Sequence, residues 1–263
     1  MEITFCGTGG ARFVVLRQLR ATAGFIVRGK ASIYFDPGPG ALLRSLQLGV
    51  DLGKLDAVAI SHAHIDHSND ANLLVEAMTN GGKRRRGMLI GSSSALEGND
   101  RFDRVVSLYH QRMVERKFIV KAGDKLSVKG VEVEVTPTKH EDETGVGFKL
   151  TSSGRTVGYT GDTDYLPELG RIFSGCDCLI LNNLKPAGCH YPGHLDSELS
   201  IRILKEARPK KAVIQHFGMG MLRAGPEAEA RLIQKESGVE TVAAKDGMVV
   251  TVEEGKKLLD FQE

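Results

Sequence analysis

The chain has 263 residues, a formal net charge of +2, 31 glycines and no tryptophan. Hydrophobic residues make up 41% and charged residues 26%, which is ordinary for a globular protein, and no apolar run approaches the roughly 20 residues of a membrane span. We therefore expect one domain over residues 1–263 and no membrane partner. The weak net charge neither demands nor excludes a nucleic-acid partner.

Short apolar runs separated by glycine, proline and aspartate predict a series of β-strands. In chain order these are Glu2–Cys6, Gly24–Val27, Ser32–Phe35, Ala57–Ile60, Met88–Ile90, Lys117–Val120, Val131–Val135, Gly147–Leu150 and Thr156–Tyr159. Helices are predicted at Ala41–Leu48, Asp70–Met78, Asp196–Ala207 and Pro226–Glu236, the third opened by an Asp/Ser cap. Few helices are predicted in the early part of the chain, whereas strands alternate with helices in its later part. We therefore expect two sheets packed between layers of helices.

The compartment is predicted from the start of the chain and from the cysteines. Residues 1–10 read as a strand and a glycine turn, without the basic and then apolar order of a signal peptide, so we expect a cytoplasmic location. The four cysteines are Cys6, Cys176, Cys178 and Cys189. Because free cysteine packs as a small hydrophobe, we expect buried thiols in a reducing compartment.

A run of four basic residues, Lys83–Arg86, follows two glycines and has two interpretations. Charge runs at glycine turns are commonly solvated loop tips. Arginine side chains could instead contact phosphates, because their planar forks match phosphate oxygens bidentately.

The densest group of candidate metal ligands follows the apolar run Ala57–Ile60. Within six residues the chain offers His62, His64, Asp66 and His67. Alternate side chains at the end of a strand point to the same side, so His62 and His64 can chelate one ion. Asp66 and His67 lie beyond the turn and can bind a second ion. A surface histidine cluster is the alternative, but it would not explain this density.

The pattern H-x-H-x-D-H at such a strand end resembles the hallmark of the metallo-β-lactamase superfamily. The resemblance implies an α/β fold, the four-layer αββα sandwich of two mixed β-sheets flanked by helices, in a single hydrolase domain. It also implies two divalent metal ions, with zinc expected and manganese or iron as alternatives for histidine and carboxylate ligands. Asp36, which ends the segment Ile33–Phe35, resembles the family aspartate that orients a metal ligand.

Further motifs in the order of the family imply the remaining ligands. The implied set is His62, His64 and His140 on one ion, Asp66, His67 and His216 on the other, and Asp162 shared between them. Water between two such ions loses a proton near neutral pH and becomes the nucleophile, so we predict hydrolysis and count Asp66 among the catalytic residues as well. The histidine at position 64 argues against oxygen-reducing diiron relatives, whose hallmark carries a glutamate there.

The segment Tyr191–Ser197 resembles a histidine motif of tRNA 3′-end-processing endonucleases and related phosphodiesterases. The resemblance implies that His194 assists at the scissile phosphate, as proton donor to the leaving oxygen or as stabiliser of its charge. A hydrogen bond near the helix start and an additional metal ligand are the alternatives. The glycine-rich opening Phe5–Gly10 resembles the same enzymes. The short stretch between His140 and Asp162 leaves no room for their protruding tRNA-clasping arm.

We therefore predict a metal-dependent phosphodiesterase acting on a nucleotide or a short nucleic acid. A lactonase or thioester hydrolase with the same metal site is the enzymatic alternative, and a metal-binding scaffold protein is the non-enzymatic one. The expected partner is a phosphodiester or other small-molecule substrate, with a short nucleic acid as an option. The sequence does not determine the oligomeric state, for which a homodimer is one option. His110 is interpreted as part of a solvated loop and His190 as structural, near the mouth of the site.

Overall fold

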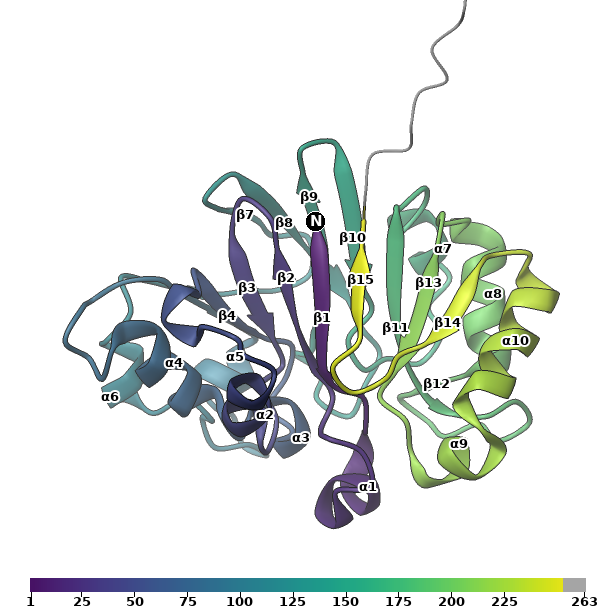
Figure 1. Ribbon diagram of the computed structural model, residues 1–263, viewed down its shortest axis with the longest axis horizontal. Coiled ribbons are helices and arrows are strands. Elements are labelled where there is room, and N and C mark those ends of the chain that lie inside the picture. The colour runs from purple at the N-terminus through teal and green to yellow at the C-terminus, as the bar shows by residue number, and fades with distance from the viewer. Residues whose placement is uncertain (253–263) are drawn as a thin grey trace, which may run out of the picture.

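The computed structural model describes residues 1–252. Two mixed β-sheets pack face to face, and helices cover the outer face of each sheet (Figure 1). This arrangement confirms the four-layer sandwich predicted from the sequence. Among the described helices, none is both long and apolar enough to cross a membrane.

The first sheet has the strand order β15-β1-β2-β3-β4-β5-β6. Its strands are β1 (Glu2–Gly7), β2 (Gly24–Arg28), β3 (Ser32–Phe35), β4 (Ala57–Ile60), β5 (Met88–Gly91), β6 (Arg116–Ile119) and β15 (Val249–Thr251). Pairing is antiparallel from β15 to β3 and parallel from β3 to β6. Because parallel strands end at the same edge, Asp36 after β3 and His62 after β4 become neighbours.

The second sheet has the order β14-β13-β11-β10-β9-β8-β7, and the short β12 pairs with β11. Its strands are β7 (Lys125–Val128), β8 (Val131–Pro137), β9 (Val146–Ser152), β10 (Arg155–Tyr159), β11 (Cys178–Lys185), β12 (Leu195–Asp196), β13 (Ala212–Gln215) and β14 (Thr241–Ala243). Strands β10, β11, β13 and β14 are parallel. Asp162 and His216 follow the carboxyl ends of β10 and β13, so both sheets contribute to one edge.

Helices α2 to α6 accompany the first sheet and α7 to α10 the second (Figure 1). Their bounds are α1 (Ala11–Arg17), α2 (Ala41–Gln47), η1 (Leu52–Lys54), α3 (Ile65–Ser68), α4 (Ala71–Thr79), α5 (Ser93–Leu96), α6 (Leu108–Gln111), α7 (Leu169–Ile172), α8 (Ser197–Ala207), α9 (Met219–Ala224) and α10 (Pro226–Ser237). The predicted Asp/Ser cap of α8 is present, because the Asp196 carboxylate accepts a hydrogen bond from the backbone N–H of Leu199 at 2.9 Å.

The central core lies between the two sheets and supports the site. On β2 the side chains of Phe25 and Val27 face this core, whereas Ile26 faces the helical layer, as the alternation of a strand requires. The ring of Phe25 meets Tyr159 edge-on, with centroids 4.8 Å apart. Tyr159 is thereby fixed by packing, with its hydroxyl group directed to the edge where the predicted ligands lie.

Every strand predicted from the sequence is present within two residues of its expected bounds, and so are the four predicted helices. The short helices α3, α5, α6 and α7 were missed because a single turn shows no periodicity. One prediction about cysteine is wrong. Cys189 is exposed, because it lies in the surface loop before β12, whereas Cys6, Cys176 and Cys178 are buried as expected.

Candidate metal centre

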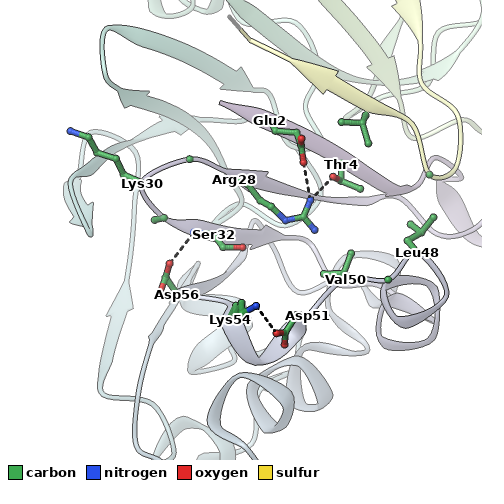
Figure 2. Close-up of a pocket in the computed structure, with 15 residues that line it drawn as sticks. Glu2, Thr4, Arg28, Lys30, Ser32, Leu48, Val50, Asp51, Lys54 and Asp56 are labelled. Carbon is green, nitrogen blue, oxygen red and sulfur yellow. Dashed lines mark hydrogen bonds and ion pairs between the residues drawn. The ribbon is translucent and has the colours of Figure 1, made fainter.

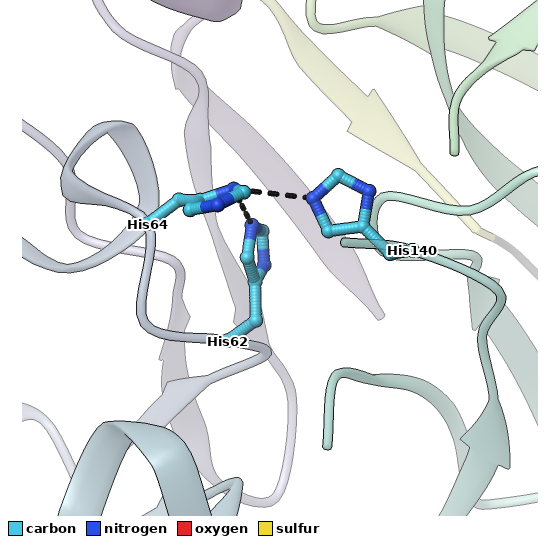
Figure 3. A group of neighbouring side chains, drawn as sticks. All are labelled: His62, His64 and His140. Atoms are coloured by element: carbon cyan, nitrogen blue, oxygen red, sulfur yellow. Dashed lines mark hydrogen bonds between the residues drawn. The ribbon is translucent and has the colours of Figure 1, made fainter. Parts of the chain in front are cut away.

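Three of the predicted ligands converge on one point. The Nδ1 atom of His64 lies 3.1 Å from Nε2 of His62 and 3.1 Å from Nε2 of His140 (Figure 3). Three imidazole nitrogens around a tetrahedral zinc ion, at about 2.05 Å each, lie roughly 3.3 Å apart. Their observed spacing therefore fits a single metal ion.

A second group forms beside the first from Asp66, His67 and His216. The Nε2 atoms of His67 and His216 are 3.0 Å apart, and Nε2 of His216 lies 3.3 Å from a carboxylate oxygen of Asp66. The structure thus brings together the residues that the sequence assigned to a second ion, although they come from opposite sheets.

The carboxylate of Asp162 lies between the two groups. Its Oδ2 atom is 3.3 Å from Nε2 of His67 and 3.5 Å from Nε2 of His216. Its ligand atom also groups with those of His62 and His140. Two dications at close range repel strongly unless an anionic oxygen lies between them, and Asp162 is placed to supply it. Metal ligation by these seven residues stays a prediction.

Hydrogen bonds to the far side of each ring direct the nitrogen atoms inward. The Nδ1–H groups of His62, His67 and His140 donate to the hydroxyl of Ser61 at 2.9 Å, to a carboxylate oxygen of Asp36 at 2.9 Å and to the carbonyl of Gly193 at 2.8 Å, respectively. These contacts direct the Nε2 atom of each ring into the cluster, where a metal ion would bind it.

Asp36 orients ligands of both groups. Its carboxylate accepts hydrogen bonds from the hydroxyl and the backbone N–H of Ser61, each at 2.7 Å, from the hydroxyl of Tyr159 at 2.5 Å, and from His67. Through Ser61 it also holds the ring of His62. The orienting contact predicted for Asp36 is thus present, whereas the contacts of Ser61 and Tyr159 were not predicted from the sequence.

A further side chain that the sequence analysis missed is Asn182 on β11. Its Nδ2 atom donates to Oδ1 of Asp162 at 2.6 Å, which leaves Oδ2 facing the histidines. The sequence feature that could have identified it is polarity, since Asn182 and Asn183 interrupt an otherwise apolar strand. The structure shows that both side chains are buried. Buried amides in such a position need partners, and here one partner is the candidate bridging carboxylate.

The charge states of these groups suit cation binding. Burial lowers the pKa of His62 well below its usual range, so this ring is neutral. For Asp162, burial raises the pKa, but the neighbouring His216 and His67 outweigh it and hold the carboxyl ionised. Burial opposes a charge on His67, yet the carboxylates of Asp162, Asp66 and Asp36 raise its pKa well above normal. His67 therefore carries a proton among these carboxylates, and a metal ion would have to displace it.

The glycine-rich loop after β1 packs directly against the second group. A Cβ atom on Gly10 would lie 2.3 Å from Nδ1 of His216, so only glycine allows this approach. The backbone N–H of Ala11 donates to Oδ2 of Asp66 at 3.0 Å. The segment that the sequence singled out at Phe5–Gly10 thus shapes the site through its backbone.

His194 lies at the edge of the cluster. Its Nε2 atom is 3.9 Å from Oδ2 of Asp162, and its ring stacks on that of His140 with centroids 4.7 Å apart. Its Nδ1–H donates to the carbonyl of Gly193 at 2.9 Å, the same oxygen that His140 uses. Burial lowers the pKa of His194 to about 4, so the ring is neutral at pH 7 in the protein alone.

The two unassigned histidines lie in different surroundings. The interpretation of His110 as part of a solvated loop is wrong, because this residue lies on α6 with its side chain only 20% exposed. Its Nε2 atom lies 3.3 Å from a carboxylate oxygen of Glu76, and it belongs to none of the ligand groups. His190 lies near His194, and its ring nitrogens are 3.4 Å from a carboxylate oxygen of Asp196 and 3.7 Å from one of Asp164. These contacts help to hold the loop that carries His194, and the interpretation of His190 as structural stays a prediction.

Half of the basic run is also structural. Arg85 donates to the backbone carbonyl of Val114 at 3.0 Å, and Arg86 donates to that of Leu55 at 2.9 Å. These arginines fasten the loop after α4 to its neighbours. Lys83, Arg84 and Arg85 are nevertheless exposed, and phosphate binding by this run stays a prediction.

The cluster opens into a cleft of about 1200 Å³. Helix α1 forms one wall, where Phe13 and Leu16 are 67% and 80% exposed, and the loop that carries His194 forms another. A second hollow, of about 590 Å³, contains none of the candidate ligands (Figure 2). Its charged side chains pair with one another, as Arg28 does with Glu2 at 3.2 Å and Lys54 with Asp51 at 3.2 Å. The first cleft is therefore the candidate substrate site.

Comparisons with known proteins agree with this geometry. Residues 31–217 match the family model described as "Beta-lactamase superfamily domain". The uncharacterised protein MJ1374 of Methanocaldococcus jannaschii is 35% identical over 257 residues, which are 97% of each chain. A ribonuclease Z of Mycobacterium bovis is 29% identical over 198 residues, 68% of this chain and 69% of the relative. The metallo-beta-lactamase fold protein YhfI from Bacillus subtilis superposes with a TM-score of 0.77 at 23% identity, covering 95% of this chain and 98% of that one.

We predict that the purified protein binds two zinc ions per chain and that His64→Ala or Asp162→Ala removes metal and activity together. The first variant removes one of the three histidine ligands of the first ion, and the second removes the carboxylate oxygen that lies between the two positive charges. Elemental analysis after dialysis against zinc measures the content. His110→Ala is the matched control and should keep both ions. One ion or none in the unmodified protein with excess zinc would contradict the dinuclear site.

We also predict that Asp36→Asn weakens zinc binding by about 10- to 100-fold, because the amide cannot accept all the hydrogen bonds that orient His62 and His67. Competition with a chelator of known affinity measures the change. Asp51→Asn, which alters the exposed cap of η1, is the control and should leave affinity unchanged. Equal affinities for both variants would show that Asp36 does not set ligand orientation.

Proposed function

The chain belongs to the metallo-β-lactamase superfamily, and from that premise we propose that this metal-dependent hydrolase is a phosphodiesterase acting on a nucleotide or a short nucleic acid. The observation that carries the proposal is the position of His194, whose Nε2 atom faces the candidate bridging carboxylate of Asp162 from the cleft side. A thioester hydrolase with the same ligand set has no need of such a group, because a thiolate departs more readily than an alkoxide.

Two divalent ions, with zinc as the proposed metal, would activate a water molecule and polarise a phosphoryl oxygen. The protein's own residues then have two tasks. The ligand rings, held by Asp36, Ser61 and Gly193, fix the position of the phosphate with little reorganisation during the reaction. His194 delivers a proton to the departing oxygen.

The protonation of His194 depends on the substrate in this proposal. Without substrate its Nδ1–H is engaged by Gly193 and its Nε2 atom carries a lone pair. A phosphodiester brings a negative charge beside the ring, which raises the pKa of His194 and favours a proton on Nε2. The acid form would thus arise when the phosphate to be cleaved is bound.

A relative supports phosphodiester chemistry, and the local chain geometry supports a small substrate. One relative is a ribonuclease Z, which is consistent with phosphodiester chemistry. Strands β8, β9 and β10 are joined by short turns at residues 138–145 and 153–154, so this region forms no protruding arm. We therefore propose a nucleotide or short nucleic acid as the substrate rather than a structured RNA.

We predict that His194→Ala keeps both metal ions yet slows hydrolysis of diesters with poor alkoxide leaving groups by roughly 100-fold or more. Bis(p-nitrophenyl) phosphate should be affected less, because p-nitrophenolate departs without a proton. Steady-state rates on both substrates and the metal content of the variant measure the contrast. His110→Ala is the matched control, since it makes the same change away from the cluster.

Each other outcome has a distinct meaning. Equal losses on both substrates would replace proton donation by charge stabilisation, and loss of metal would make His194 a ligand. Faster hydrolysis of lactones or thioesters than of any phosphodiester by the unmodified protein would overturn the proposed function in favour of an acyl hydrolase.

A further inference from the structure

Tyr191 lies in the loop that carries His194, and its side chain is 54% exposed. Its ring forms part of the cleft wall and lies 5.5 Å from the ring of His194, measured between centroids. Large aromatic side chains are normally covered by their own protein, so a ring left open beside a candidate proton donor is available to a ligand.

The loop around Tyr191 is held in place. The backbone carbonyl of Tyr191 accepts a hydrogen bond from the N–H of His194 at 3.1 Å, and the carbonyl of Gly193 accepts from both His140 and His194. On the outer side, His190 lies between the carboxylates of Asp164 and Asp196. These contacts fix the backbone of the loop, and so the point from which the Tyr191 side chain extends, before any substrate binds, which reduces the entropy cost of binding.

Lys185, at the end of β11, completes this side of the cleft. Its Nζ atom lies 5.6 Å from the centroid of the Tyr191 ring, a cation–π distance. Within residues 1–252, no carboxylate lies within ion-pair distance of this ammonium group. It can therefore offset the negative charge of a phosphate that approaches Tyr191.

The opposite aromatic wall is less open. The ring of Phe102 lies 5.4 Å from that of His64, but the guanidinium of Arg101 lies 5.7 Å from the Phe102 centroid and is itself paired with Glu141. Each ring thus has a cation near one face, but the guanidinium of Arg101 is held by Glu141, whereas the ammonium of Lys185 has no ion-pair partner among the described residues.

We propose that Tyr191 stacks on a flat ring of the departing alcohol, so that the leaving group is a nucleoside. The inference rests on the proposed role of His194. If His194 donates its proton to the departing oxygen, the group attached to that oxygen extends toward His194 and its neighbour Tyr191. Hydrolysis adds water to phosphorus, breaks the bond from phosphorus to the nucleoside oxygen, and places a proton on that oxygen.

Adenosine 5′-methyl phosphate tests the inference through its products, because its two ester groups leave as chemically similar alkoxides. Departure of the ring-bearing group yields adenosine and methyl phosphate, whereas departure of methoxide yields adenosine monophosphate and methanol. We expect the first pair from the unmodified protein. Base–aromatic stacking contributes about 1–3 kcal/mol, so Tyr191→Leu should reduce kcat/KM for adenosine release by roughly 5- to 150-fold.

Two further variants separate stacking from a loss of structure. Tyr191→Phe keeps the ring and should release adenosine at nearly the unmodified rate. Tyr109→Leu removes another exposed tyrosine, 65% exposed on α6 and outside the cleft, and should change nothing. Adenosine should also inhibit hydrolysis of bis(p-nitrophenyl) phosphate, and less so in Tyr191→Leu.

The failure of this inference differs from the failure of the proposed function. If the protein hydrolyses the diester but releases adenosine monophosphate and methanol, the stacking role of Tyr191 is overturned while the proposed function stands. The same conclusion follows if adenosine inhibits the unmodified protein and Tyr191→Leu equally. If no phosphodiester is hydrolysed, the proposed function fails, and the leaving-group assignment fails with it.

Discussion

The buried carboxylate of Asp36 is the constraint on which the metal centre depends. It follows β3 of the first sheet, accepts hydrogen bonds from Ser61 after the neighbouring β4, and accepts another from Tyr159 of the second sheet. One charged group thus joins the two sheets and orients the rings of His62 and His67. Four donors compensate the cost of burying its charge. The backbone of Asp36 has a φ of 51°, a conformation that aspartate tolerates better than most side chains.

The positions of the other candidate ligands follow from the direction of the strands. Parallel strands of both sheets end at a common edge, and the chain places a ligand after β4, β10 and β13 there. The residue after β13, His216, also has a positive φ, of 63°, which turns its ring back toward Asp66. The same edge forms the floor of the cleft, where His194 and Tyr191 face an incoming substrate.

Much of the site could be predicted from local sequence. Four ligands in six residues are visible because chelation needs short spacing, and the later ligands stand at ends of apolar runs. The supporting contacts of Tyr159 and Asn182 could not be predicted, because they join residues far apart in the chain and look like core positions. The single-turn helices were missed for lack of periodicity. Cys189 is exposed because tertiary contacts set the path of its loop, and the composition of the chain does not predict that path.

The most direct test of a dinuclear centre organised in this way is anomalous diffraction at the zinc edge from crystals grown with zinc. We expect two peaks per chain, one among His62, His64 and His140 and the other among Asp66, His67 and His216, with Asp162 between them. A single peak, or peaks at other positions, would contradict the account.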